Sequence, residues 1–395
     1  MRLSSSIGRF AAVKIALAGM MAAMLVACGA PGAGGGPGGA SFTQSTGAVK
    51  VALLLPVTSS GSTPAVAKAL KQAAELALFD FDNPNVSLVP KDTKGTPDGA
   101  RLAAESAIKD GAELIIGPLF AQEVAGAAPV ARQAGIPMIA FSSDEKVAGN
   151  GVYLLSFQAG RDVPRIVSFA MSKGKRSFAQ LLPQSPYGRV AESAFAKAVS
   201  GGGGETSVRA AFPTDDSNAM LGPVRQIANA IKGGQKVDAL FLPAGREELP
   251  SLAPLLASSD LTSGRLQFVG TGQWDYPNIG GEKALVGGWY PAPDPKGWSN
   301  FVQRYSKTYG SVPPRLASLA YDAVSLAVSL SQNPPGQRYD MGQLTRASGF
   351  AGIDGLFRLL PDGTCERGLA ILEVREGGPV VIDPAPSSFA TASSY

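Results

Sequence analysis

The sequence predicts an α/β protein built from two doubly wound parallel-sheet lobes with a cleft between them. Two observations support this class. Predicted strands and helices alternate twice along the chain, and the first strand, residues 49–55, is apolar in nearly every position, as in strands buried on both faces. Because right-handed helical crossovers join parallel strands, each alternation predicts a sheet covered by helices on both faces. A chain of 395 residues is long enough for two such cores.

The first alternation occupies residues 49–158. Thr63 and Pro64 supply a helix N-cap and a proline at the first helical position, and apolar residues follow at three- and four-residue steps. We expect strands at 49–55, 86–89, 114–116 and 138–141, with helices at 63–77, 97–108 and 122–133 between them. Residues 153–157 either extend this sheet or leave it.

The second alternation begins at residue 161 and is of similar length. It predicts helices at 161–171, 188–199, 220–231 and 249–257, and strands at 177–182, 207–212, 238–242 and 267–270. Two further helices are expected at 298–310 and 314–330. Residues 355–360 and 369–375 alternate around the turn signal Pro361-Asp362-Gly363, which predicts a β-hairpin with a longer loop.

The N-terminus is organised like a bacterial lipoprotein precursor. Three basic residues precede an apolar run over residues 15–27, which is shorter than the roughly 20 residues that span a membrane. Leu25-Val26-Ala27-Cys28 resembles a lipobox, where signal peptidase cuts before a cysteine that is then lipidated. We therefore expect a signal peptide over residues 1–27, a lipid anchor at Cys28 and a flexible glycine-rich linker over residues 28–48. A short membrane anchor or a buried helix is the alternative.

The composition excludes several classes of function. The chain contains no histidine, which removes Ser-His-Asp and Cys-His catalysis and most zinc sites. Without the three cations of the signal peptide the chain is nearly neutral, which argues against nucleic-acid binding. We expect no enzymatic activity, no cofactor and no metal. Once Cys28 is lipidated, Cys365 is the one remaining thiol, and its place after a turn predicts a surface position.

Two doubly wound units with a helical return resemble the type 1 periplasmic binding proteins, the leucine-binding fold, over residues 49–383. The resemblance implies three crossings between the lobes and a ligand in the cleft. It implies a first lobe of residues 49–158 plus about 297–350, and a second lobe of residues 159–296 plus about 351–383. Residues 384–395 are expected to form a polar tail.

Several short sequence motifs narrow this resemblance to one family of lipoproteins. They are GPLFAQE at 117–123, WYPAPDP at 289–295, AYDA at 320–323, GLFR at 355–358, PDGT at 361–364, ERGLA at 366–370 and VIDPAP at 381–386. In this order they resemble the alphaproteobacterial lipoproteins called penicillin-binding protein activators. That resemblance implies a regulator that contacts a peptidoglycan synthase on the periplasmic side of the envelope. Gly29, after Cys28, favours the outer membrane over the inner one. The alternative is the substrate-binding lipoprotein of a branched-chain-type amino-acid ABC transporter.

Candidate ligand residues follow the carboxyl ends of the predicted strands, where α/β proteins bind ligands. In amino-acid-binding relatives, hydroxyls and helix N-terminal amides hold the ligand carboxylate; Ser142, Ser143 and Tyr187 match those positions, although the serines could instead cap a helix. Phe120 stands where such relatives often place a hydroxyl. Trp274 either stacks on a ligand or packs at a lobe edge. The candidate residues are Phe120, Gln122, Ser142, Ser143, Asp144, Tyr187, Gln273 and Trp274.

Overall fold

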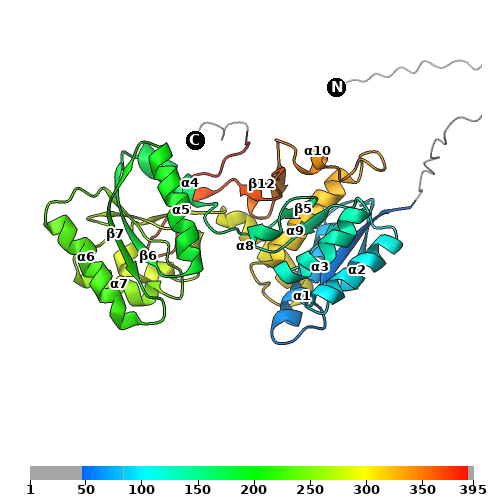
Figure 1. Ribbon diagram of the computed structural model, residues 1–395, viewed down its shortest axis with the longest axis horizontal. Helices are drawn as coiled ribbons and strands as arrows, with labels where there is room; N and C mark the ends of the chain where they lie inside the picture. Colours follow the sequence, from blue (N-terminus) through cyan, green and yellow to red (C-terminus); the bar gives the residue numbers. More distant parts are fainter. Residues whose placement is uncertain (1–46, 83, 390–395) are drawn as a thin grey trace, which may run out of the picture. The chain divides into compact units, whose positions relative to one another are not determined.

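The computed structural model describes residues 47–82 and 84–389, which all belong to one compact unit. The predicted signal peptide, Cys28, most of the linker and the last six residues lie outside the described residues. Within the described ranges, none of the helices has the length and apolar character needed to cross a membrane. The predicted fold class is confirmed, since two parallel sheets covered by helices form the two lobes (Figure 1).

The first sheet is parallel throughout and has the strand order β2-β1-β3-β4-β5. Its strands are β1 (Val49–Leu55), β2 (Val86–Asp92), β3 (Leu114–Ile116), β4 (Met138–Ala140) and β5 (Val152–Leu154). Residues 153–157, which the sequence left undecided, therefore begin as the edge strand β5 and then leave the sheet.

Helices cover both faces of this sheet because β1 is apolar on both sides. Val51 and Leu53 pack in one core with α1 (Thr63–Phe79) and α9 (Ala317–Leu330). Ala52 and Leu54 point the other way, into a core with α2 (Pro97–Lys109) and α3 (Ala121–Gln133). This alternation follows from the two-residue period of a strand.

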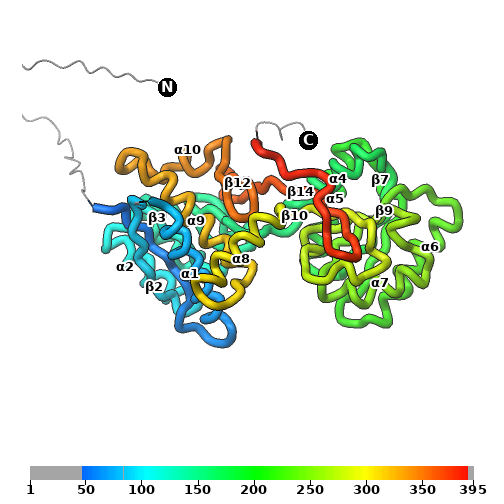
Figure 2. Tube along the Cα trace, turned by 180° about the vertical axis from the view of Figure 1, so that it is seen from behind, coloured from blue at the N-terminus to red at the C-terminus, as the bar shows by residue number. Residues whose placement is uncertain are grey.

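The second sheet has the order β15-β14-β10-β9-β8-β6-β7. Its parallel strands are β6 (Ser177–Pro183), β7 (Glu205–Phe212), β8 (Ala239–Phe241), β9 (Gln267–Val269) and β10 (Trp289–Ala292). β14 (Ala370–Glu373) and β15 (Val380–Asp383) add antiparallel strands at one edge, so the C-terminal segment lies beside β10 (Figure 2). The sequence did not predict β10, whose Pro291 is unusual within a sheet.

Helices cover both faces of the second sheet, as they do in the first. α4 (Val163–Ser172) and α5 (Pro186–Gly201) pack with Phe178 of β6, whereas α6 (Leu221–Lys232) and α7 (Leu249–Ser258) pack on the opposite face with Leu181. The remaining helices are α8 (Pro295–Tyr309), α10 (Met341–Leu344) and 3-10 turns at Glu145–Val147, Ser217–Met220, Gly272–Trp274, Ile279–Gly281 and Lys283–Leu285.

The third lobe crossing lies later in the chain than predicted. β11 (Phe350–Gly352), β12 (Gly355–Leu359) and β13 (Cys365–Arg367) form a small antiparallel sheet. Phe350, Phe357 and Cys365 pack in the first lobe's core, so residues 350–365 belong to that lobe. The sequence had assigned residues from about 351 onward to the second lobe. The chain crosses between the lobes at residues 156–162, 293–294 and 368–369.

The strand that pairs with β12 also differs from the one predicted. β12 pairs with β13, not with residues 369–375, because β14 instead pairs with β10 and β15 in the second sheet. The turn at Pro361-Asp362-Gly363 is where expected, but the strand that follows it is short and ends at Arg367. β13 therefore belongs to the first lobe and directly precedes the third crossing.

Candidate functional site

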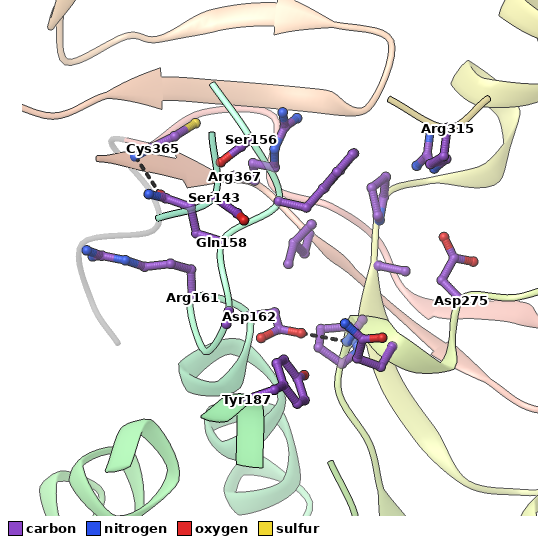
Figure 3. Close-up of a pocket in the computed structure, with 18 residues that line it drawn as sticks. Ser143, Ser156, Gln158, Arg161, Asp162, Tyr187, Asp275, Arg315, Cys365 and Arg367 are labelled. Atoms are coloured by element: carbon purple, nitrogen blue, oxygen red, sulfur yellow. Dashed lines mark hydrogen bonds between the residues drawn. The ribbon is translucent and has the colours of Figure 1, made fainter. Parts of the chain in front are cut away.

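A cavity of about 400 Å³ lies beside the crossing segments and is lined by residues of both lobes (Figure 3). Its apolar wall comes from Phe157 and Ala159 of the first crossing, and from Pro291, Pro293 and Leu369 near the other two. Its volume is within the range of pockets that enclose small organic ligands. The cavity is therefore the candidate binding site of the described chain.

Three of the eight residues predicted from sequence line this cavity: Ser143, Tyr187 and Gln273. Phe120 is 38 % exposed but does not line the cavity, and Gln122 donates through Nε2 to Gly95 O at 3.1 Å. The predicted strand-end positions thus divide between the cavity and other surfaces of the lobes.

The segment after β4 also differs from expectation. Ser142 is buried, and its Oγ accepts a hydrogen bond from Asp144 N at 3.1 Å. The Asp144 carboxylate accepts from Lys146 N and caps the 3-10 turn at Glu145–Val147. The residue that caps the turn is therefore Asp144, and of this segment Ser143 alone lines the cavity.

Trp274 belongs to the core and not to the cavity wall. Its side chain is 0 % exposed, its Nε1 donates to Leu242 O at 3.1 Å, and its ring centroid lies 6.1 Å from that of Tyr290. A side chain without exposed surface cannot stack on a ligand, so of the two interpretations of Trp274 the structure selects packing.

One end of the cavity carries a hydroxyl and a carboxylate. Tyr187, held at the start of α5, donates its hydroxyl to Thr271 Oγ1 at 2.7 Å. Asp162 Oδ2 accepts from Gly272 N at 2.5 Å, whereas the buried Oδ1 has no hydrogen-bond partner. Burial raises the pKa of Tyr187 and of Asp162, because both charged forms lose solvation there. Asp162 therefore offers an acceptor to a ligand that brings a donor.

Three arginines line the cavity, and two of them are paired. Arg161 forms an ion pair with Glu145 at 2.8 Å, and Arg315 forms one with the buried Asp354. For Arg367, all three guanidinium nitrogens are buried without a hydrogen-bond partner. The guanidinium carbons of Arg315 and Arg367 lie 5.3 and 4.7 Å from the centroid of the Phe157 ring. Phe157 thereby contacts both cations.

A buried acidic pair lies close to these arginines. Asp354 accepts from Ser318 Oγ at 2.6 Å, and Asp322 Oδ1 accepts from Ile353 N at 2.7 Å. Burial, followed by the neighbouring Asp354, raises the pKa of Asp322 to about 7, and the charge of Arg367 opposes that shift. The cluster thus combines two carboxyls with two guanidiniums.

The expected surface position of Cys365 is wrong. Its side chain is 3 % exposed, packs in the first core and lines the cavity, because β13 folds onto that core. Its backbone N–H donates to Gln158 Oε1 at 3.0 Å. Burial raises the pKa of the thiol to about 11.

Sequence reasoning missed most of the charged and polar lining. Asp162, Arg161 and Gln158 lie on the first crossing, where no strand-end pattern points to them, and Arg315 precedes α9. Arg367 was noted as part of a family-like run but not as a site residue. Gln158, Arg161 and Asp162 flank the predicted lobe boundary at residues 158–159, which is their one signal in the sequence, whereas Arg315 lies away from the predicted boundaries.

The fold and the cavity define a two-lobed α/β binding protein. A family model described as periplasmic binding protein matches residues 48–379, so the chain belongs to that family. The curated "Leu/Ile/Val-binding protein homolog 6" of Brucella melitensis biotype 1 is 26 % identical over 192 residues, which cover 47 % of each chain. The aligned region therefore spans about half the length of this relative.

Two solved structures share the fold. A putative branched-chain amino acid ABC transporter protein from Rhodospirillum rubrum is 20 % identical, with a TM-score of 0.73 over 85 % of this chain and 100 % of its own. The substrate-binding protein LivJ from Streptococcus pneumoniae, in complex with isoleucine, is 18 % identical, with a TM-score of 0.54 over 85 % of this chain and 100 % of its own.

Proposed function

We propose that this chain is a solute-binding protein that captures a small carboxylate-bearing molecule, an amino acid above all, for an ABC transporter. The observation that carries this proposal is the cavity of about 400 Å³, which has an apolar wall and several polar atoms without partners. Each buried unsatisfied polar group costs about 1–3 kcal/mol. A ligand that supplies the missing partners recovers this free energy on binding.

The charged groups of the cavity suit a ligand that carries a hydrogen-bond donor at one end and a carboxylate at the other. Asp162 presents an unpartnered carboxylate oxygen, which favours an ammonium or hydroxyl donor. Arg367 presents unpartnered guanidinium nitrogens, which favour a carboxylate. An amino acid carries both groups, and its side chain would contact the apolar wall around Pro291 and Leu369. The named ligands and roles of the related proteins support the same choice.

We also propose that binding occurs without catalysis and that Cys28 is lipidated. The lipid would hold the protein at the periplasmic side of the envelope. Gly29 favours the outer membrane, which agrees with the regulator described below better than with a receptor for an inner-membrane transporter. These proposals rest on the lipobox-like run and on a chain without histidine. Lipidation is tested by mass spectrometry of the membrane-extracted protein; an unmodified Cys28, or a retained signal peptide, would contradict it.

A regulator of peptidoglycan synthases is the second candidate. It rests on the ordered runs at 117–123, 289–295, 320–323, 355–358 and 361–364. In that role a protein partner replaces the transporter, and the cavity need not hold a solute. The two candidates therefore predict different partners for the same fold.

Thermal denaturation separates the two candidates. The full chain is melted with leucine, isoleucine, valine and a set of polar amino acids, each at millimolar concentration. A ligand at about 100 times its dissociation constant adds about 2.7 kcal/mol to the unfolding free energy, which raises the melting temperature measurably. Asp162→Asn should reduce this shift, because an amide nitrogen replaces the carboxylate oxygen that receives the ammonium.

Asp144→Asn is the matched control, since Asp144 lies outside the cavity, and it should leave the ligand-induced shift unchanged. The receptor proposal fails if no amino acid shifts the melting temperature. Co-purification of the full chain with a peptidoglycan synthase from membranes, together with that result, would favour the regulator.

A further inference from the structure

The first crossing presents two unsatisfied polar side chains to the cavity. Ser156 and Gln158 are only 3 % and 8 % exposed, and both line the cavity. Ser156 Oγ and Gln158 Nε2 are buried without a hydrogen-bond partner. Two such atoms two residues apart, on a segment that bends between the lobes, are costly unless a bound group satisfies them.

The orientation of the Gln158 amide is fixed by its other contact. Gln158 Oε1 accepts the backbone N–H of Cys365 at 3.0 Å, and only the oxygen of the amide can accept that bond. The nitrogen Nε2 is therefore the atom left over, and it can only donate. This contact also holds the first crossing against β13, two residues from Arg367 (Figure 3).

Arg367 brings further donors to the same wall. Its guanidinium carbon lies 4.7 Å from the ring of Phe157, the residue between Ser156 and Gln158. Its Nε, Nη1 and Nη2 are all unpartnered, whereas Arg161 and Arg315 already have carboxylate partners. Arg367 is thus the cavity arginine that, within the described chain, has no carboxylate partner.

Asp322 is the neighbouring carboxyl group that could occupy the guanidinium donors of Arg367 in place of a ligand. The two charges interact, since Arg367 lowers the pKa of Asp322, but no hydrogen bond joins them. Asp322 uses Oδ1 to accept from Ile353 N. Asp322 therefore offsets the arginine charge without occupying its donors, which leaves them for a ligand.

We propose that Ser156 Oγ, Gln158 Nε2 and the Arg367 guanidinium form a subsite that binds the carboxylate of the ligand on the crossing-segment wall. This inference rests on the proposed solute-binding function and deepens it. The donors that hold the carboxylate lie on the first crossing and on β13. Ser142 and Ser143, which follow β4, do not bind it. Its two oxygens accept from the fork of Arg367 and from the two neutral donors, which matches the bidentate geometry of arginine.

Matched ligand pairs test the subsite. Calorimetric titration of the full chain compares leucine with leucinamide and benzoate with benzamide, pairs that differ in the carboxylate alone. The wild-type protein is expected to bind the carboxylate member of at least one pair ten-fold or more tightly than its amide. Equal binding of both members overturns the subsite.

Gln158→Glu is the sharpest variant. Glutamate keeps an oxygen for the N–H of Cys365 and replaces the donor Nε2 by a second acceptor, which repels a carboxylate. Affinity for the carboxylate ligand should fall ten-fold or more, while affinity for the amide changes little. Gln122→Glu, at a glutamine outside the cavity, should leave both affinities as they are.

Ser156→Ala provides a second variant that adds no charge, and it should weaken carboxylate binding about three- to thirty-fold. Circular dichroism and the unliganded unfolding midpoint establish that each variant is folded. If the wild-type protein binds a carboxylate ligand and both variants bind it equally well, the subsite is wrong while the solute-binding function stands. If no member of either pair and no amino acid binds, both proposals fail.

Discussion

Replacement of Trp274 by phenylalanine separates a core role from a ligand-binding role at a position where the sequence allowed both. Trp274 is fully buried, and its Nε1 donates to Leu242 O at 3.1 Å. Phenylalanine lacks that donor and leaves the carbonyl without this partner, at a cost of about 1–3 kcal/mol. It also lacks two ring carbons, which removes about 1.6 kcal/mol of buried apolar contact at roughly 0.8 kcal/mol per carbon.

The expected loss is therefore about 3–5 kcal/mol of unfolding free energy, within the range of large core truncations. Urea denaturation followed by circular dichroism measures it, and the midpoint should fall by about 1 M or more at an m-value of 2–3 kcal/mol/M. Affinity for the best amino-acid ligand should change less than three-fold, because Trp274 has no surface on the cavity. A ten-fold loss of affinity with an unchanged midpoint would refute the assignment of Trp274 to the core.

Two further predictions concern buried titratable groups. The variant Cys28→Ser leaves Cys365 as the single thiol of the chain. Because burial raises the pKa of this thiol from 9.0 to about 11, its alkylation at pH 8 should be at least about 100-fold slower in the folded than in the unfolded protein. Similar alkylation rates in the two states would contradict the burial of Cys365. The folded-state pKa of Asp322 is raised from 3.8 to about 7, so this carboxyl lowers the unfolding free energy progressively as the pH rises from about 4 to 7. Asp322→Asn should abolish that part of the pH dependence in urea titrations, and parallel wild-type and variant profiles would argue against it.

The alternation of strands and helices could be predicted because each element carries its own pattern. The apolar run at residues 49–55 became β1, and its odd and even positions face two separate cores. The start of α2 is similarly local, since Thr96 accepts a hydrogen bond from Gly99 N at 3.0 Å. The N-cap expected at Thr63 is not made, because α1 begins at Thr63 and its N-cap Ser62 accepts no side-chain hydrogen bond. Such signals depend on neighbours within a few residues, and they are visible in the sequence.

The C-terminal third shows where local pattern is insufficient. Residues 355–359 alternate as expected, but their partner was chosen by the core of the first lobe, which β13 completes with Cys365. The segment at 370–373 reads equally well as a hairpin strand, yet it pairs with β10. Strand pairing over long sequence distances is decided by which faces can be buried together, and a single sequence does not specify this.

The site residues predicted from the sequence likewise fall into two groups, those that line the cavity and those that do not. Strand-end reasoning located Ser143, Tyr187 and Gln273, because the carboxyl ends of parallel strands meet at one edge of a sheet. It also pointed to Trp274, Ser142 and Asp144, whose side chains the fold turns into the core or into local caps. The orientation of a side chain at a strand end depends on the packing around it, and not on its position in the sequence.

By itself, the sequence determined the fold class and the two-lobe organisation, since both rest on short-range pattern and composition. Only the tertiary structure decided which polar groups lack partners. Arg367 follows Ser156 and Gln158 by about 210 residues, and the three meet because the first crossing and β13 both pass the cavity at the junction of the lobes. A hydrogen bond left unmade is a property of three-dimensional surroundings, and it is this property that makes the cavity the candidate binding site.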